Sequence, residues 1–332
     1  MTPRRKDYLG LLVLLGVMSV VPLITDQPYQ LNLFVMAGIY TIICVGLNLL
    51  IGYAGQMSLG QAAFYGIGAY TTAILTTKFG APAWLGLSLA PIITGALAYL
   101  IGTPILRLRG LSLAMASFAF GEIMLILFAE QTQWTGGVMG TRSIPKIALG
   151  TFELDTPGRF YYLVWILAVF VLWIALNLVR TRVGRVLRAV RDNEDAASSL
   201  GVDTASFKVA IFALSAAFAG LGGALYAHYL SFVSPDSFNF FVNIMVIVIV
   251  IVGGMRQVWG VVLGALLMVW LGEFLRQYKE LNMVIYGLAL ILMVAFMPGG
   301  LFGVVEQLVG RVSRIVLPPS PNAEPPNESE AT

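Results

Sequence analysis

The sequence predicts an all-α polytopic membrane protein with about ten transmembrane helices. Of its 332 residues 58% are apolar and only 11% are charged, whereas soluble domains carry about 25% charged residues. Apolar stretches recur along the chain at the length of a membrane-spanning helix, about 20 residues. They are continuously apolar and do not alternate with polar residues, so helices are favoured over the strands of a membrane barrel.

Ten such stretches lie between residues 8 and 303, which we expect to form one transmembrane domain. They cover approximately 8–25, 31–52, 58–77, 83–103, 111–129, 160–179, 209–230, 238–255, 257–275 and 281–303. Within them only Glu122 and Glu273 are charged. The run from Val246 to Val252 contains only Val and Ile, which is also typical of a buried strand, but its apolar flanks make it part of a span.

Two short terminal segments flank this domain. Residues 1–7 are basic, and no small-x-small cleavage pattern follows the first span, so we expect that span to be retained rather than removed as a signal peptide. Residues 304–332 form the C-terminal tail. From about residue 317 the tail contains five prolines together with Asn, Ser and Glu, a composition that predicts disorder.

The distribution of basic residues predicts the orientation, because loops rich in Lys and Arg resist translocation. With the N-terminus inside, ten spans place fourteen of the 20 basic residues in the cytoplasm. These are Arg4, Arg5, Lys6, Arg107, Arg109, Arg180, Arg182, Arg185, Arg188, Arg191, Lys208, Arg256, Arg311 and Arg314. The outer side receives Lys78, Arg142, Lys146, Arg159, Arg276 and Lys279. We therefore expect both termini and the loop at about 180–208 to be cytoplasmic.

Residue counts exclude several kinds of site. Cys44 is the only cysteine and His228 the only histidine, which excludes disulfide frameworks and Cys/His zinc sites. No Gly-Lys pair occurs, so the chain has no ATP-binding GxxxxGK[ST] loop. A formal charge of +3, without basic runs interleaved with aromatics, argues against nucleic-acid binding. We expect no catalytic residue, metal or cofactor on this chain.

An intramembrane enzyme is a further class that the sequence disfavours. It would need a nucleophile and a base on facing helices, and His228 has no serine in a GxSxG setting nearby. Coupled proton transport is disfavoured too, because Glu122, Glu273 and His228 are scattered over three spans.

The loop at about 180–208 predicts a short amphipathic helix. Apolar residues recur at helical spacing on one side, namely Val183, Val186, Leu187, Val190 and Ala197. Arginines recur every three residues on another side, namely Arg182, Arg185, Arg188 and Arg191. A small-residue turn that ends at Gly201 is expected to follow the helix.

Lipid headgroups and a protein partner are both possible contacts for this helix. Its arginines suit an anionic membrane surface. However, Asp192, Glu194 and Asp195 cluster at its C-terminal end, where phospholipids would repel them. A surface with an arginine side, an acidic end and an apolar edge is better suited to a protein partner.

The segment from Asp195 to Gly201 resembles the Glu-Ala-Ala loop of permease subunits of bacterial ABC importers. Asp195 stands in place of the Glu, Ala196 and Ala197 match, and Gly201 falls at the same offset. The Leu-Pro pair that closes the family pattern is absent.

Longer stretches resemble one permease family more specifically. They are NLLIGYAGQMSLGQAAFYGIGAY (48–70), RVGRVLRAVRDNEDAASSLGV (182–202) and SAAFAGLGGALYAH (215–228). Together they are similar to the LIV-type permeases of ABC importers for branched-chain (hydrophobic) amino acids, over about residues 30–303. The resemblance implies a multi-pass protein of the bacterial cytoplasmic (inner) membrane that forms half of a translocation pathway.

The resemblance also implies partners. They are a second permease subunit, a paralogue or a copy of this chain, two cytoplasmic ATPase subunits that bind ATP and Mg, and an extracytoplasmic substrate-binding protein. A permease for urea or short-chain amides carries similar motifs and stays an alternative, as does, from a different class, a stand-alone channel.

In that family setting Arg188 to Gly201 would form the coupling helix that sits in a groove of the ATPase. The residues implied are Arg188, Arg191, Asp192, Glu194, Asp195, Ala196, Ala197 and Gly201. The small residues allow close approach, and the acidic residues can pair with basic groups on the partner.

A second candidate site is the segment 51–69, which is rich in glycine. Gly52, Gly55 and Gly60 weaken helix continuity, and unwound backbone at membrane depth survives only where it lines a cavity or is buried in protein. The candidate pathway residues are Asn48, Gly52, Gly55, Gln56, Ser58, Gly60, Gln61 and Glu122. Two alternatives stay open: a tight turn with small-residue helix packing, and a Glu122 that only pairs with a neighbouring helix.

Overall fold

Helices make up most of the computed structural model, which describes residues 3–24, 27–149, 152–153, 156–275, 287–288 and 303. Six helical segments in this part of the chain are long and apolar enough to cross a membrane. They are α2 (Pro28–Asn48) with its π-helical continuation η1 (Leu49–Tyr53), α4 (Ala83–Ile105), α5 (Leu111–Glu130), α7 (Pro157–Arg180), α10 (Thr204–Leu230), and the 3-10 turn η3 (Pro235–Phe238) with α11 (Phe240–Gly253).

Three further helices coincide with predicted spans. Two of them are apolar but shorter than a span, the Asp7–Pro22 part of α1 (Pro3–Ile24) and α12 (Val258–Phe274). The third, α3 (Gln61–Thr77), has 17 residues and includes Gln61 and several threonines. Nine of the ten predicted spans therefore coincide with helices, whereas the tenth, 281–303, lies almost entirely outside the described residues. The helical fold is confirmed in the described part of the chain, and the number of ten spans stays a prediction.

Local sequence signals explain where several helices begin. Pro28 and Pro157 occupy the first turns of α2 and α7 after extended residues, where the missing proline N–H is not needed. The side chain of Asp203 accepts a hydrogen bond from the Ser206 backbone N–H at the start of α10. Asn239 caps α11 in the same way.

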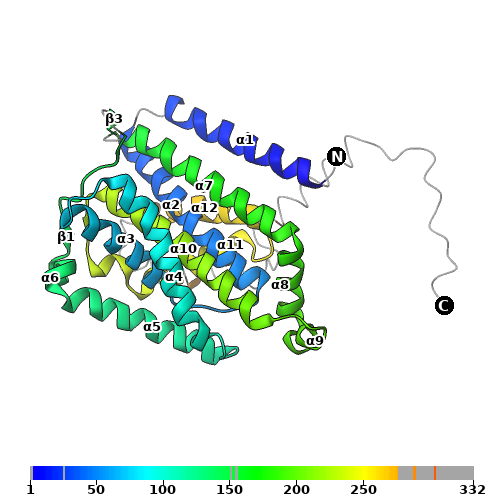
Figure 1. The fold of residues 1–332 in the computed structure, drawn as a ribbon. Helices are drawn as coiled ribbons and strands as arrows, with labels where there is room; N and C mark the ends of the chain where they lie inside the picture. The colour runs from blue at the N-terminus through cyan, green and yellow to red at the C-terminus, as the bar shows by residue number, and fades with distance from the viewer. Residues whose placement is uncertain are drawn as a thin grey trace, which may run out of the picture.

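The helices run side by side, with α2 and α10 inside the bundle (Figure 1). Helix α2 packs against α7, α10, α11 and α12, and α10 packs against α2, α3 and α4. Helices α3 and α10 approach so closely that a Cβ atom on Gly68 would overlap the backbone of Gly220, as is common where small residues bring membrane helices together. Of the six candidate spans, α2 is the most buried and α5 the least.

The two ends of the bundle differ in their connections (Figure 1). One end, which we call the α8–α9 end, carries α8 (Arg182–Asp192) and α9 (Glu194–Ser199). The opposite end carries α6 (Thr132–Thr135), the 3-10 turn η2 (Gly137–Met139) and four two-residue strands. Strand β1 (Thr141–Arg142) pairs antiparallel with β4 (Phe232–Val233), and β2 (Ala148–Leu149) pairs with β3 (Phe152–Glu153).

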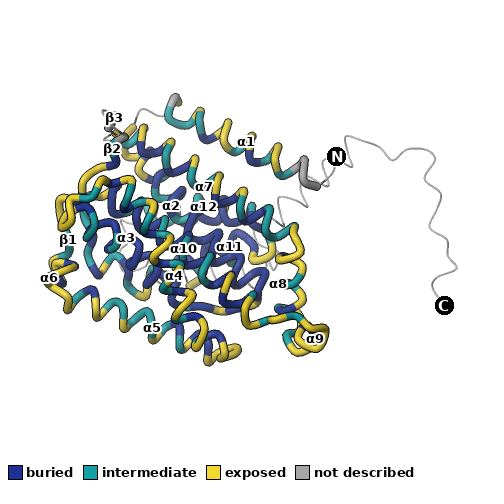
Figure 2. Tube along the Cα trace, viewed as in Figure 1, coloured by how far each residue is buried: buried dark blue, intermediate teal, exposed yellow. Residues whose placement is uncertain are grey.

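Burial follows this arrangement. Figure 2 shows buried residues concentrated in α2, α3 and α10, whereas α9 is mostly exposed. The bundle therefore positions α9 as a projection at one end of a tightly packed core.

Candidate functional site

Helices α8 and α9 form an arm that extends from the end of α7 to the start of α10. The predicted amphipathic helix is present as α8, which contacts α7, α10 and η1. Its buried side consists of Gly184, Leu187 and Val190. The predicted apolar side is wrong at Val183, which is exposed, because the face directed at the bundle is rotated toward Gly184.

The predicted turn at 195–201 is instead a second short helix. Asn193 is extended and ends α8, and its Oδ1 accepts a hydrogen bond from the Ala196 backbone N–H at 3.0 Å, which starts α9. Gly201, at φ +81°, follows the end of α9 in the left-handed conformation, as the predicted helix stop requires. Ala197 is buried, and Ala196 is exposed.

Glu194 ties the arm to the bundle. Its carboxylate pairs with the Lys208 Nζ of α10 at 2.8 Å and with the Arg109 Nε of the α4–α5 connection at 3.5 Å. The Lys208 side chain is only 6% exposed, so Glu194 neutralises a buried cation. The Glu194 carboxylate is thus engaged within this chain, and its role toward a partner stays a prediction.

The other two acidic residues of the arm face solvent. Asp195 pairs with Arg109 at 3.1 Å and Asp192 with Arg191 at 2.9 Å, and both aspartates are largely exposed. Exposed pairs of this kind contribute little to stability, about 0–1 kcal/mol. They leave an acidic surface at the arm that a basic partner can still reach.

Leu200 was not singled out from the sequence. It lies directly after α9 and is 86% exposed, although a large apolar side chain at a water-facing turn gains nothing from solvent. The signal was present in the printed sequence, as the only large apolar residue among the small and polar residues from Asn193 to Gly201.

The second candidate site is a break between α2 and α3. Helix α2 widens into the π-helical segment η1 and then gives way to an irregular turn that contains Gly55 at φ +68°. Short π-helical segments are frequent at functional sites. Gly52 lies in η1, and a Cβ atom there would overlap the carbonyl oxygen of Met255, so only glycine fits.

The turn between α11 and α12 closes one side of this break. The Asn48 Nδ2 donates to the Met255 carbonyl at 3.1 Å and, at 3.4 Å, to the Gly254 carbonyl. The Tyr53 hydroxyl donates to the Arg256 carbonyl at 2.8 Å. The break is therefore held by side-chain hydrogen bonds rather than by regular helix bonds.

Ser58 and Gln61, after the break, both form hydrogen bonds, Ser58 within the turn and Gln61 to a neighbouring helix. The Gln61 Nε2 donates to the Ser215 carbonyl of α10 at 3.2 Å, and the Ser58 hydroxyl accepts from the Gly60 N–H at 3.3 Å. Both side chains are buried. Their hydrogen bonds favour the packing alternative for Ser58 and Gln61.

Gln56 differs from these residues. It is buried, with 5% of its surface exposed, and neither its Oε1 nor its Nε2 has a hydrogen-bond partner among the described residues. An unsatisfied buried amide costs about 1–3 kcal/mol.

Glu122 lies apart from the break, in the middle of α5. It is half-buried, and no described residue forms a hydrogen bond or ion pair with it. The preceding residue, Gly121, lies against Leu59 and Gly60 in the turn. The structure thus brings α5 to the break without joining the Glu122 carboxylate to the other candidates.

A cavity of about 390 Å³ lies at the α8–α9 end. It is bordered by the end of α4, the α4–α5 connection, Glu194 and the start of α10.

The hydroxyl and backbone N–H of Ser206 donate to Asp203 and lower the pKa of its carboxyl, which keeps this cap of α10 ionised.

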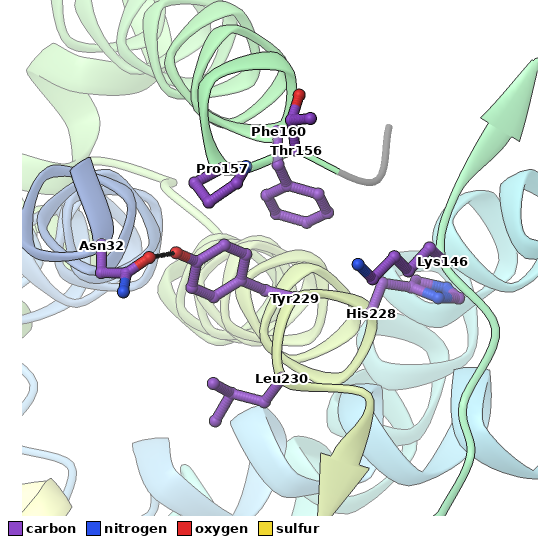
Figure 3. Close-up of a pocket in the computed structure, with 8 residues that line it drawn as sticks. All are labelled: Asn32, Lys146, Thr156, Pro157, Phe160, His228, Tyr229 and Leu230. Carbon is purple, nitrogen blue, oxygen red and sulfur yellow. Dashed lines mark hydrogen bonds between the residues drawn. The ribbon is translucent and has the colours of Figure 1, made fainter. Parts of the chain in front are cut away.

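A second cavity, of about 270 Å³, lies at the opposite end, and the sequence did not indicate it. Figure 3 shows the residues that line it: Asn32, Lys146, Thr156, Pro157, Phe160, His228, Tyr229 and Leu230. They come from four separate segments, so no spacing pattern connects them. One cation, an amide and hydroxyls beside an aromatic wall suit a small polar molecule.

His228 supports the wall of this cavity. Its Nδ1 lies 2.7 Å from the Pro145 carbonyl, and its Nε2 lies 2.8 Å from the Thr72 hydroxyl. Because a carbonyl only accepts hydrogen bonds, Nδ1 carries the proton. With both ring nitrogens engaged, His228 joins α10 to α3 and to the 143–147 segment. In the described residues no group of three or more His, Cys, Asp or Glu side chains is arranged to hold a metal.

Comparisons with known proteins identify relatives over most of the chain. A family model described as branched-chain amino acid transport system / permease component matches residues 29–294. The high-affinity branched-chain amino acid transport system permease protein LivM of Salmonella typhimurium is 36% identical over 319 residues, 89% of this chain and 75% of the relative. LivM of Escherichia coli is 38% identical over 286 residues, 79% of this chain and 67% of the relative. No solved structure matches the chain.

Proposed function

We propose that this chain, which belongs to the family of permease components of branched-chain amino acid transport systems, is a LivM-like permease subunit of an ATP-binding-cassette importer. The observation that carries the proposal is the similarity to two LivM proteins at 36% and 38% identity over most of the chain. Six helices of spanning length and composition support a multi-pass protein of the inner membrane. The substrates are branched-chain amino acids.

In this proposal the chain forms half of a pathway and the second permease subunit forms the other half. Helix α5 is the least buried of the six candidate spans, and an unpaired carboxylate facing lipid at mid-span costs about 2.5–3.5 kcal/mol. Packing of α5 against the second permease shields Glu122 from lipid. A few polar groups among apolar walls suit a zwitterion with an aliphatic side chain.

The α8–α9 arm faces the cytoplasm and docks on an ATPase subunit. Three features support this assignment: the exposed Leu200, the acidic surface formed by Asp192 and Asp195, and the firm attachment of the arm through Glu194. ATP and Mg bind to the two ATPase subunits, whose closure moves the arm. The opposite end, with both outer strand pairs, faces the substrate-binding protein.

Reconstitution tests the function. The chain is placed in proteoliposomes with its second permease, its ATPase subunits and its substrate-binding protein, and uptake of labelled leucine is measured with and without ATP. We expect accumulation that requires ATP and the ATPase subunits. Accumulation of urea or acetamide but not leucine would assign the amide alternative, and leucine flux without the ATPase would assign a channel.

Leu200 tests the docking surface separately. The substitution Leu200→Asp places a charge where the proposal requires an apolar contact, so we expect loss of ATPase co-purification. Leu200→Met keeps the apolar contact and should retain the ATPase. Val138→Asp makes the same kind of change at the opposite end, where Val138 is also exposed, and should retain it too. If the ATPase still co-purifies with the Leu200→Asp variant as it does with the parent, this docking surface is refuted.

A further inference from the structure

Arg191 connects the α8–α9 arm to the helix break, although the two segments are 139 positions apart in sequence. The Arg191 Nη1 donates to the Gly52 carbonyl at 2.7 Å. The Arg191 Nε, at 3.1 Å, and Nη2, at 2.9 Å, both donate to the Asp192 Oδ1. The Arg191 side chain is only 19% exposed, so this bond is shielded from water.

The helix break itself creates the acceptor. In a regular α-helix the Gln56 N–H would donate to the Gly52 carbonyl, four residues earlier. Here the Gln56 N–H donates to the Leu50 carbonyl at 3.1 Å. The Gly52 carbonyl therefore lacks its helical donor, and Arg191 supplies one.

The contact is also tight in a steric sense. A Cβ atom on Gly55 would meet the Arg191 Cγ at 2.6 Å, and one on Gly52 would overlap the Met255 carbonyl oxygen. The break is thus enclosed between Arg191 on one side and the α11–α12 turn on the other. Because packed interiors do not deform continuously, α8 cannot shift without either losing the Arg191–Gly52 bond or moving the break.

We infer that Arg191 is a positioning residue that transmits movement of the α8–α9 arm to the end of α2, and so sets the break against the α11–α12 turn. This inference rests on the proposed function, in which the ATPase moves the arm. Arginine suits the role because its planar fork binds Asp192 on the arm and Gly52 in the break at once. Glu194, by contrast, links the arm to α10 and the α4–α5 connection.

Distances between spin labels in the assembled importer test the inference. Labels are placed on Ser198→Cys in α9, on Met57→Cys in the turn after the break, and on Phe79→Cys at the opposite end as the reference. Ser198, Met57 and Phe79 are exposed and the native Cys44 is buried, so Cys44 does not label. The Ser198–Phe79 and Met57–Phe79 pairs are measured without nucleotide and after trapping with ATP and vanadate.

We expect both distances to change on trapping in the parent chain. Arg191→Met keeps the methylene stem that packs on Gly55 but lacks a donor. In this variant the Ser198–Phe79 distance should still change on trapping, whereas the Met57–Phe79 distance should not. Leucine uptake per ATP hydrolysed should fall about tenfold. Arg191→Lys supplies one donor, so it should recover part of the Met57–Phe79 distance change and part of the leucine uptake. Arg185→Gln removes an exposed arginine from the same helix and should behave as the parent.

Two results would overturn the inference. One is that Arg191→Met shows the same change in the Met57–Phe79 distance and the same leucine uptake as the parent. The other is that Arg191→Lys recovers neither the distance change nor the uptake relative to Arg191→Met. Should Arg191→Met fail to assemble, Arg191→Gln, whose side chain is too short to reach Gly52, replaces it under the same criteria. If trapping moves neither label in the parent, the proposed function fails, and the inference fails with it.

Discussion

Gln56 is buried beside the break with both amide atoms unpaired among the described residues. Such a group is tolerated at a cost in stability and is often kept for function. Replacing it with an apolar side chain of similar length removes the unsatisfied atoms, whereas a hydrogen-bonded residue such as Gln61 would lose bonds to α10.

We therefore expect Gln56→Met to raise the free energy of unfolding by about 1–3 kcal/mol while lowering leucine uptake. Thermal unfolding in detergent and uptake in proteoliposomes measure the two effects. The matched variant Gln61→Met should lower stability, because it removes the hydrogen bonds from the Gln61 Nε2 to the Ser215 and Ile43 carbonyls. A Gln56→Met protein that is less stable than the parent would contradict this account of the residue.

Whether the Glu122 carboxylate is shielded from lipid depends on what covers α5. Glu122 is one of the predicted pathway residues, and in the proposal it lies where α5 meets the second permease subunit. Glu122→Gln should therefore keep membrane insertion and assembly but lower the kcat/KM for uptake about tenfold, or about 1.4 kcal/mol. Glu130→Gln, at the exposed end of the same helix, should leave uptake unchanged. Normal uptake with impaired assembly in Glu122→Gln would favour the alternative in which Glu122 only pairs with a helix.

At the scale of elements, the attachment of α9 depends on the Glu194–Lys208 pair more than on the exposed Asp195–Arg109 pair. Glu194→Gln leaves Lys208 as a buried cation without its counter-ion, so we expect a loss of about 1–3 kcal/mol of local stability. Hydrogen exchange of the α9 amides should accelerate.

Two matched variants complete this test. Asp195→Asn should change exchange in α9 little, because that pair is exposed. Adding Lys208→Met to Glu194→Gln should recover part of the protection, because the uncompensated charge is removed. Equal exchange rates in the parent and in Glu194→Gln would show that the pair does not hold α9.

The sequence predicts elements better than it predicts contacts between them. The position of α8 follows from valines and arginines at helical spacing, and Gly201 has the left-handed conformation that was predicted for a helix stop. The helix at 194–199 was missed because its small polar residues favour turns, and because the cap on Asn193 depends on local geometry. The apolar side of α8 was misplaced at Val183, since burial depends on which face meets η1 and α10.

Long-range features could not be read from spacing at all. The Arg191–Gly52 bond joins two segments far apart in the chain, and the cavity in Figure 3 collects residues from four segments. The eight candidate coupling residues do share one arm, and seven of the eight candidate pathway residues gather around one break, with Glu122 apart on α5. Their roles in coupling and transport stay predictions.

At the scale of the whole molecule, the connections at 53–60, 106–110, 181–203 and 254–257 meet at the α8–α9 end through named contacts. Arg180 pairs with Asp7, Tyr53 binds the Arg256 carbonyl, and Arg109 binds α9. The connections that were predicted to be cytoplasmic thus share one end of the bundle in the described part of the chain, whereas the predicted cytoplasmic tail, 304–332, lies outside the described residues. In the proposed function, closure of the ATPase at this end therefore acts on α2, α5 and α10 together.

Coupling to ATP hydrolysis requires the α8–α9 arm to lie on the side of the membrane where ATP is available. The most direct measurement is labelling of Ser198→Cys with a membrane-impermeant maleimide in intact cells and in inside-out vesicles, with Val138→Cys as the marker of the opposite end. We predict that Ser198→Cys is labelled only in inside-out vesicles and Val138→Cys only in intact cells. Labelling of Ser198→Cys in intact cells would place the arm outside and contradict the mechanism.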